Sequence, residues 1–326
     1  MPHTSVLKPD DSLGVIPTVQ ANATWYNDFG WASPSGAMYS SAADLAQFAR
    51  LILRDFNSFT NTSLGLPGYV LREWLKPHSY TASNTHFVGL PWEDLRPTFT
   101  RLNGGFPFTI HAKSGSLLFY VSSLSIIPEY GMGLAVLASG GTGLESTVLA
   151  DIIVQRFAAA VEAHRVQYAR DTYAGVYNGT SGNISSVYEL RVPDDGLGLE
   201  IVRWEAAGYD LLSGVLGGQV PNNTGAPVLR LQRKVRRQEN NSTTTVSFRL
   251  FPTQVETPDT WRYAPYTQAL PTTESVFAGL CGEWFGTDSG YYGGQPLDMI
   301  RFVRDEGGRV TGVEIPWLRL QLTKQT

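Results

Sequence analysis

Near residue 168 the hydrophobic spacing of this 326-residue chain changes from helical to strand-like, and few folds accommodate both patterns. Between about residues 143 and 163, large apolar residues recur at helical spacing. Beyond residue 168, short runs alternate apolar with polar residues and are separated by polar turns, which is typical of strands with one buried face. The sequence therefore predicts an α+β protein of two domains, a mixed domain over residues 1–165 and an all-β domain over residues 168–326.

The all-β prediction depends on three stretches. Two of them place apolar residues at every second position, namely Leu197, Leu199 and Ile201 in one and Val246, Phe248 and Leu250 in the other. In the third, the Asp-Glu-Gly-Gly turn at 305–308 separates apolar runs at 300–303 and 310–315. Regular strands with polar turns over about 160 residues predict a closed or nearly closed antiparallel barrel.

The helix expected between residues 143 and 163 is amphipathic. Polar residues interrupt it at Glu145, Asp151, Gln155 and Arg156, so no apolar run approaches the ~20 residues that a membrane span needs. Larger apolar residues line one side and are predicted to face the core: Leu144, Val148, Ile152 and Phe157. In front of this helix we expect a three-stranded antiparallel sheet.

A Lys-Ser-Gly triplet at 113–115 begins the pattern that bears on function. An apolar strand, a Pro128-Glu129 turn and a second apolar strand over 132–138 follow it. Lys-[Ser/Thr]-Gly is one of three signatures of serine β-lactamases and penicillin-binding proteins. Together with the elements behind it, the triplet resembles the inner strands of the class C β-lactamase and esterase family.

Two further segments carry the same resemblance. Residues 33–50 resemble the family's Pro-x-Gly-x-x-x-Ser-x-x-Asp-Leu-Ala segment, and Ser41 with Asp44 is predicted to form a variant capping box at a helix start. The apolar face of that helix is expected to hold Leu45, Phe48, Leu51 and Ile52. Residues 87–93 (Phe-Val-Gly-Leu-Pro-Trp-Glu) resemble the Tyr-Gly-Leu-Gly-Trp element that precedes the family's Lys-Ser-Gly strand.

The resemblance implies a wall of an active site. Lys113 would direct positive charge towards a substrate carboxylate or a developing oxyanion, Ser114 would offer its hydroxyl group to the same atoms, and the N–H of Ser116 would be an oxyanion-hole donor. The alternative for Lys113 is a solvated lysine at a strand end. His111 shares the strand face of Lys113, and we expect it to be structural.

The family's nucleophile is the serine of a Ser-x-x-Lys at a helix start, and its partner motif is Tyr-x-Asn. The Ser-x-x-Lys at Ser5–Lys8 does not fit, because Pro9 follows at once and disfavours a helical Lys8. Neither Tyr-x-Asn nor Ser-Asp-Asn occurs. The chain is therefore expected to be the C-terminal part of a β-lactamase/transpeptidase-like domain, with an N-terminal segment missing, followed by a lipocalin-like barrel.

The function that the resemblance implies is that of a serine hydrolase or acyltransferase. It would act through an acyl-enzyme on a small-molecule ester, amide or lactam, in a secreted or natural-product pathway. Without a nucleophile, this chain alone is expected to be inactive. Residues 117–120 (Leu-Leu-Phe-Tyr) stand where the family has glycines, and this bulk argues against β-lactam substrates. The alternative is a pseudoenzyme that binds a ligand or a partner without catalysis.

Asparagine usage predicts a secreted glycoprotein. Seven residues begin an Asn-x-Ser/Thr sequon, against about two expected at random, and these are Asn22, Asn61, Asn178, Asn183, Asn222, Asn240 and Asn241. The N-terminus has no apolar signal sequence, which agrees with an expected missing segment.

Composition adds exclusions. One cysteine and five scattered histidines predict no metal site and no cofactor. A net charge of −4 gives no reason to expect a nucleic-acid partner. The basic residues near 230–237 alternate with apolar ones and are expected to form an exposed strand face.

Overall fold

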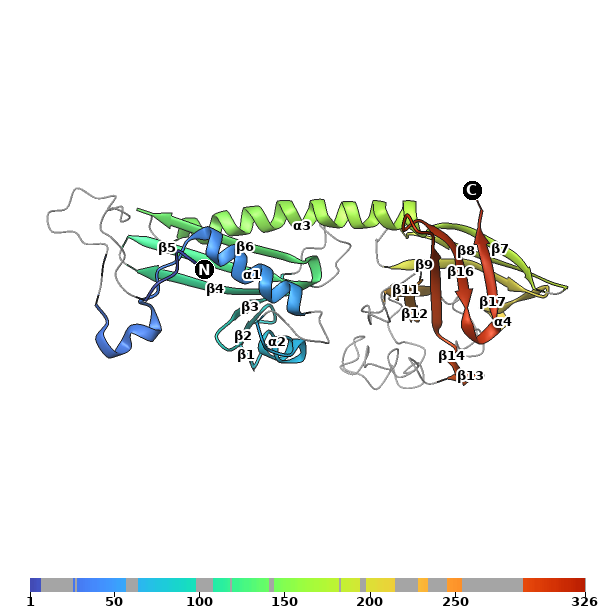
Figure 1. The fold of residues 1–326 in the computed structure, drawn as a ribbon, viewed down its shortest axis with the longest axis horizontal. Helices are drawn as coiled ribbons and strands as arrows, with labels where there is room; N and C mark the ends of the chain where they lie inside the picture. The colour runs from blue at the N-terminus through green and yellow to red at the C-terminus, as the bar shows by residue number, and fades with distance from the viewer. Residues whose placement is uncertain are drawn as a thin grey trace, which may run out of the picture. The chain divides into compact units, whose positions relative to one another are not determined.

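The computed structural model confirms the α+β class, built mostly from strands, and divides into two compact units, Met1–Ala163 and His164–Thr326 (Figure 1). It describes residues 1–6, 26, 28–56, 64–97, 108–117, 119–140, 144–181, 183–193, 198–214, 228–233, 245–253 and 290–325. Among these residues, no helix is long and apolar enough to cross a membrane.

The first unit contains a six-stranded antiparallel sheet in the order β1-β2-β3-β4-β5-β6. Its strands are β1 (Ser79–Tyr80), β2 (His86–Val88), β3 (Glu93–Leu95), β4 (Ile110–Leu117), β5 (Tyr120–Ile127) and β6 (Met132–Ser139). The predicted sheet of three strands is therefore too small. Strands β1 to β3 span only two or three residues each, which is too short to show alternation.

Helix α1 (Ala42–Phe56) covers one face of this sheet. The N–H of Asp44 donates to Ser41 Oγ at 3.1 Å, so Ser41 caps the helix as predicted. The Asp44 carboxylate does not complete the capping box, because it accepts from the N–H of His3 and the hydroxyl of Thr4, both at 2.8 Å. A β-carbon at Gly133 would lie 2.6 Å from that of Ala49, so glycine allows α1 to pack closely.

Two apolar clusters lie on opposite faces of the sheet. One joins α1 to α2 (Gly68–Trp74) and the sheet, and its buried members are Ala49, Ile52, Leu75, Trp92 and Ile126. The other joins the sheet to α3 (Leu144–Thr172) through Phe108, Ile110, Ile127 and Val154. Short 3-10 turns complete this unit at Gly30–Ser35 and Pro128–Tyr130.

The buried face of α3 is not the one that the sequence predicted. Val148, Ile152 and Phe157 are 55%, 52% and 58% exposed, while Ala150, Val154 and Ala158 are buried. Both sets follow helical spacing, and the prediction chose the bulkier one. The small residues face inward because they let the helix lie close to the strands.

The second unit contains a nine-stranded antiparallel sheet, β10-β9-β11-β12-β15-β16-β17-β7-β8, in which β8 also pairs with β9. The bounds are β7 (Gly175–Ser181), β8 (Ile184–Arg191), β9 (Leu199–Ala206), β10 (Tyr209–Asp210), β11 (Val228–Arg233), β12 (Thr245–Thr253), β15 (Met299–Arg304), β16 (Val310–Ile315) and β17 (Leu320–Lys324). Helix α4 (Leu211–Gly214), a 3-10 turn at Pro316–Leu318 and the hairpin of β13 (Tyr291–Tyr292) and β14 (Gln295–Pro296) complete the unit.

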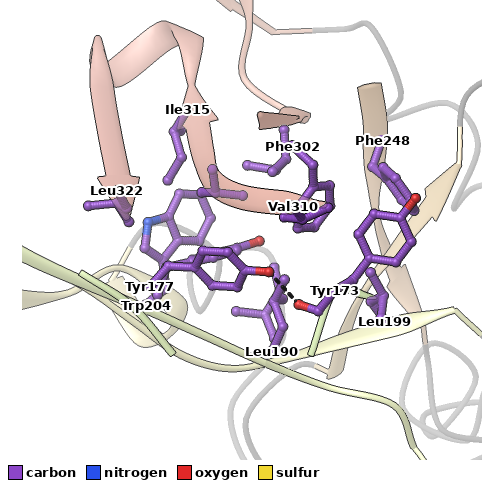
Figure 2. Packing of buried hydrophobic residues seen from close by; sticks show 14 of the residues in the cluster. Tyr173, Tyr177, Leu190, Leu199, Trp204, Phe248, Phe302, Val310, Ile315 and Leu322 are labelled. Carbon is purple, nitrogen blue, oxygen red and sulfur yellow. Dashed lines mark hydrogen bonds between the residues drawn. The ribbon is translucent and has the colours of Figure 1, made fainter. Parts of the chain in front are cut away.

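Aromatic rings dominate the core of the second unit, as Figure 2 shows. The ring of Phe302 lies 4.8 Å from that of Tyr173 and 5.0 Å from that of Phe248, both edge-to-face. The hydroxyl of Tyr177 donates to the backbone oxygen of Tyr173 at 2.6 Å. Burial raises the pKa of the Tyr177 hydroxyl far above its ordinary value, with a smaller contribution from Tyr173, so the group remains a donor.

We expect residues 164–326, expressed alone, to fold as a β-rich unit with one cooperative unfolding transition, because its buried cluster lies within it. Phe302→Ala should lower the free energy of unfolding by about 3–5 kcal/mol, since the side chain is fully buried. Tyr209→Ala, at an exposed position, should change it by about 0.5 kcal/mol or less. Circular dichroism and urea unfolding provide the measurement, and a helical spectrum or a non-cooperative transition would contradict the expectation.

Candidate functional site

The predicted site residues lie on β4, at the point where its neighbour β3 ends. Glu93, the first residue of β3, pairs with Ala112, so Lys113 to Leu117 extend beyond it along that edge. The N–H of Ser114 points to this side, and alternation along a strand directs the N–H of Ser116 the same way. The edge thus presents polar backbone groups beside a lysine.

Glu93 connects the two predicted side chains. Lys113 Nζ donates to Glu93 Oε1, and the hydroxyl and N–H of Ser114 both donate to Glu93 Oε2, at 2.8 and 3.2 Å. Lys113 Nζ also donates to the Ser114 carbonyl at 2.9 Å. About half of each charged side chain is exposed, 45% for Lys113 and 50% for Glu93, so the cluster remains open to solvent.

The pKa of the Glu93 carboxyl lies below its ordinary value. Partial burial acts to raise it, but the hydrogen bonds from Lys113 and Ser114 and the charge of Lys113 outweigh burial. The stabilisation from this cluster is therefore fully present above the ordinary glutamate pKa of about 4.3 and is lost as the pH falls through the lowered value. At neutral pH Glu93 is a carboxylate.

A tight turn over residues 89–92 positions Glu93. The N–H of Gly89 donates to the Trp92 carbonyl at 2.7 Å, and Trp92 is buried with its ring 5.1 Å from that of Trp74. A β-carbon at Gly89 would lie 2.9 Å from both Asp94 Oδ2 and Trp92 Cβ, so this turn requires glycine. These contacts explain why the residues of the Phe-Val-Gly-Leu-Pro-Trp-Glu element lie beside the Lys-Ser-Gly strand.

His111 forms a buried pair with Asp94, its partner across β3 and β4. His111 Nδ1 lies 2.7 Å from Asp94 Oδ1, and the two side chains are 7% and 0% exposed. His111 therefore has a structural environment, consistent with the expectation. Sequence reasoning named neither Glu93 nor Asp94. The available signal was two adjacent acidic residues that directly follow Trp92, ahead of the Lys-Ser-Gly strand.

The remaining sequence features lie elsewhere. Ser5 forms an isolated antiparallel bridge with Tyr39 instead of starting a helix, and Lys8 lies outside the described residues. The bulky stretch at 117–120 forms the β4–β5 connection, with Leu117 paired to Tyr120 and Leu118 outside the description. Within the described residues, no group of His, Cys, Asp or Glu side chains could hold a metal ion.

Residues 166–326 match a family described as "Beta-lactamase-like-like, C-terminal domain". The chain is similar to beta-lactamase-like proteins. It is 28% identical to "Beta-lactamase-like protein" of Arthroderma benhamiae over 342 residues, which cover 97% of this chain and 53% of the relative. It is 25% identical to "Probable hydrolase M10" of a Phoma species, with 98% and 50% covered.

A further relative supports the same similarity over a shorter stretch. "Putative beta-lactamase-like 1" of Homo sapiens is 33% identical over 123 residues, 35% of this chain and 20% of that protein. The chain spans about half the length of the first two relatives. The low identities agree with the expected hydrolase family and leave its chemistry to be argued from the site.

The buried Asp94–His111 pair should contribute more to stability than an exposed pair. Asp94→Ala leaves His111 buried without its partner, and we expect a loss of about 3–5 kcal/mol in the free energy of unfolding of the first unit. Glu73→Ala removes the exposed partner of Lys76 and should cost less than about 1 kcal/mol. Chemical unfolding followed by tryptophan fluorescence compares them, and equal losses would contradict a structural role for the buried pair.

Proposed function

We propose that this chain forms the C-terminal part of a class C-like serine hydrolase or acyltransferase. It acts through an acyl-enzyme on a small-molecule ester, amide or lactam. The observation that carries the proposal is the convergence of Lys113, Ser114 and the N–H of Ser116 at the open edge of β4. Beta-lactamase-like relatives, two of them named as probable hydrolases, support the reaction class.

The proposed role of this edge is electrostatic. In acyl transfer, negative charge develops on the carbonyl oxygen, and fixed N–H donors and a nearby cation stabilise it in the transition state. The N–H of Ser116 donates to that oxygen, while Lys113 and the Ser114 hydroxyl line the same wall. Hydrogen bonds to Glu93 hold both side chains in place before substrate binds.

The nucleophile in this proposal comes from outside these residues. A Ser-x-x-Lys helix and a Tyr-x-Asn belong to the half of the relatives' length that this chain does not cover. Neither hydrolysis nor acyl transfer to another acceptor is favoured by the β4 edge, since both pass through the same acyl-enzyme.

For the second unit we propose a lipocalin-like barrel. The support is the order of strand pairing, in which β9, β11, β12, β15, β16, β17, β7 and β8 are neighbours in turn and β8 pairs again with β9. Inward-facing rings fill its core.

A pseudoenzyme is the second candidate function. The contact that favours it is Glu93, which already accepts hydrogen bonds from Lys113 and Ser114. In that case the β4 edge is inert and the second unit binds a ligand or a partner.

We also propose that the protein is secreted and glycosylated. Of the seven sequons, Asn183 lies exposed in the turn between β7 and β8, and Asn178 lies partly buried on β7. The other five are outside the described residues: Asn22, Asn61, Asn222, Asn240 and Asn241.

Turnover of an activated ester tests the hydrolase proposal. Residues 1–326 alone should show no more than background hydrolysis of p-nitrophenyl acetate, unaffected by Ser5→Ala. A longer protein that adds a Ser-x-x-Lys and Tyr-x-Asn half should hydrolyse it, and Lys113→Ala there should cost about 2–4 kcal/mol of transition-state stabilisation. Lys76→Ala, at an exposed lysine of the same unit, is the matched control. Robust turnover by residues 1–326 that Ser5→Ala abolishes would contradict the proposal.

Glycan occupancy tests the secretion proposal. After expression through a eukaryotic secretory pathway, the protein should lose mass on treatment with an N-glycosidase, and Asn183→Gln should remove one glycan, because that side chain is exposed in a turn. Asn84→Gln, outside any sequon, serves as the control. An unchanged mass after the treatment would show that the sequons are incidental.

A further inference from the structure

The carboxylate of Glu93 lies where the donors of the candidate site converge. It accepts from Lys113 Nζ through Oε1 and from the Ser114 hydroxyl and N–H through Oε2. These are the side-chain donors that would otherwise be available to a carboxylate of a ligand. The site therefore contains an internal carboxylate, held by a turn that packs Trp92 into the core.

This arrangement changes the charge that a substrate meets. Lys113 and Glu93 together have no net charge, and at neutral pH Glu93 remains ionised because its pKa lies below the ordinary value. An anionic substrate would have to displace Glu93 or lie against a second carboxylate at close range. Like charges at such distances repel, and a built-in repulsive group is an effective source of selectivity.

A neutral substrate meets no such penalty. Its carbonyl oxygen needs only the backbone donor of Ser116 and the nearby positive end of the Lys113 side chain. Glu93 then contributes by holding Lys113 and Ser114 in fixed positions, which lowers the entropy cost of organising the site.

We propose that Glu93 is a specificity-determining residue that makes this site accept neutral acyl substrates, such as simple carboxylic esters, and reject substrates with a carboxylate beside the reacting carbonyl. The inference rests on the proposed function, since it narrows the substrate class of the same site. It assigns to Glu93 the exclusion of anionic lactams and peptides with a free terminal carboxylate.

A binding titration tests this without catalysis. Benzoate is titrated at pH 7 into residues 1–326 while the backbone amide signals of Ser114 and Ser116 are followed by NMR. The wild type should show no saturable shift. Glu93→Gln removes the charge and keeps a carbonyl acceptor for Ser114, so benzoate should bind at least about tenfold more tightly, since hydrogen bonds to a charged group contribute more than 1.4 kcal/mol.

Two controls make the result specific. Adding Lys113→Ala to Glu93→Gln should remove the gained binding, because the cation that attracts benzoate is gone. Glu73→Gln frees Lys76 from an equivalent exposed pair and should create no site, since no backbone donor lies beside it among the bonds of that pair. If Glu93→Gln does not fold, as judged by circular dichroism, Glu93→Ala replaces it.

The outcomes separate the two proposals. Equal benzoate binding by the wild type and both Glu93 variants overturns the role of Glu93, whatever the protein catalyses. In the longer enzyme, Glu93→Gln should raise kcat/KM for an ester with a neighbouring carboxylate relative to its neutral analogue by about tenfold. Gained benzoate binding in a longer protein that hydrolyses neither ester would overturn the hydrolase proposal alone.

Discussion

The pairing of the short strand β3 with the first half of β4 underlies the whole candidate site. Because β3 begins at Glu93, opposite Ala112, the rest of β4 has an open edge. The same pairing brings Asp94 to His111 below the surface and Glu93 to Lys113 at the surface. Two adjacent acidic residues thus serve different ends, one buried pair that holds the strands and one exposed pair that sets the charge of the edge.

That pairing depends in turn on a turn of four residues. Gly89 permits a close approach to Asp94 that a side chain would prevent, and Trp92 anchors the turn in the cluster beneath α1. The site is therefore supported by apolar packing that includes none of its functional groups. A substitution in the Trp92 cluster would be felt at Lys113 through the position of Glu93.

The parts of the fold that were predictable are those with enough residues to repeat a pattern. Strands β4 to β6, helix α1 and the turn between β15 and β16 follow from alternation, helical spacing and capping. Strands β1 to β3 did not, because two or three residues cannot alternate. The face of α3 was wrong because Ala150, Val154 and Ala158 form a second stripe, and close approach to the sheet favours small side chains. Lys113, Ser114 and Ser116 came from a motif, whereas Glu93 acts through a cross-strand contact that no local pattern encodes.

The central claim is that the edge of β4 stabilises the oxyanion of an acyl-enzyme. A crystal structure of the longer protein after reaction with a fluorophosphonate, which leaves a tetrahedral adduct on the nucleophilic serine, tests it most directly. The account predicts the phosphonyl oxygen about 2.7–3.1 Å from the N–H of Ser116, with Lys113 on the same wall and still bonded to Glu93. An adduct whose oxygen is bound by donors away from β4, or no labelled serine facing this edge, would contradict it.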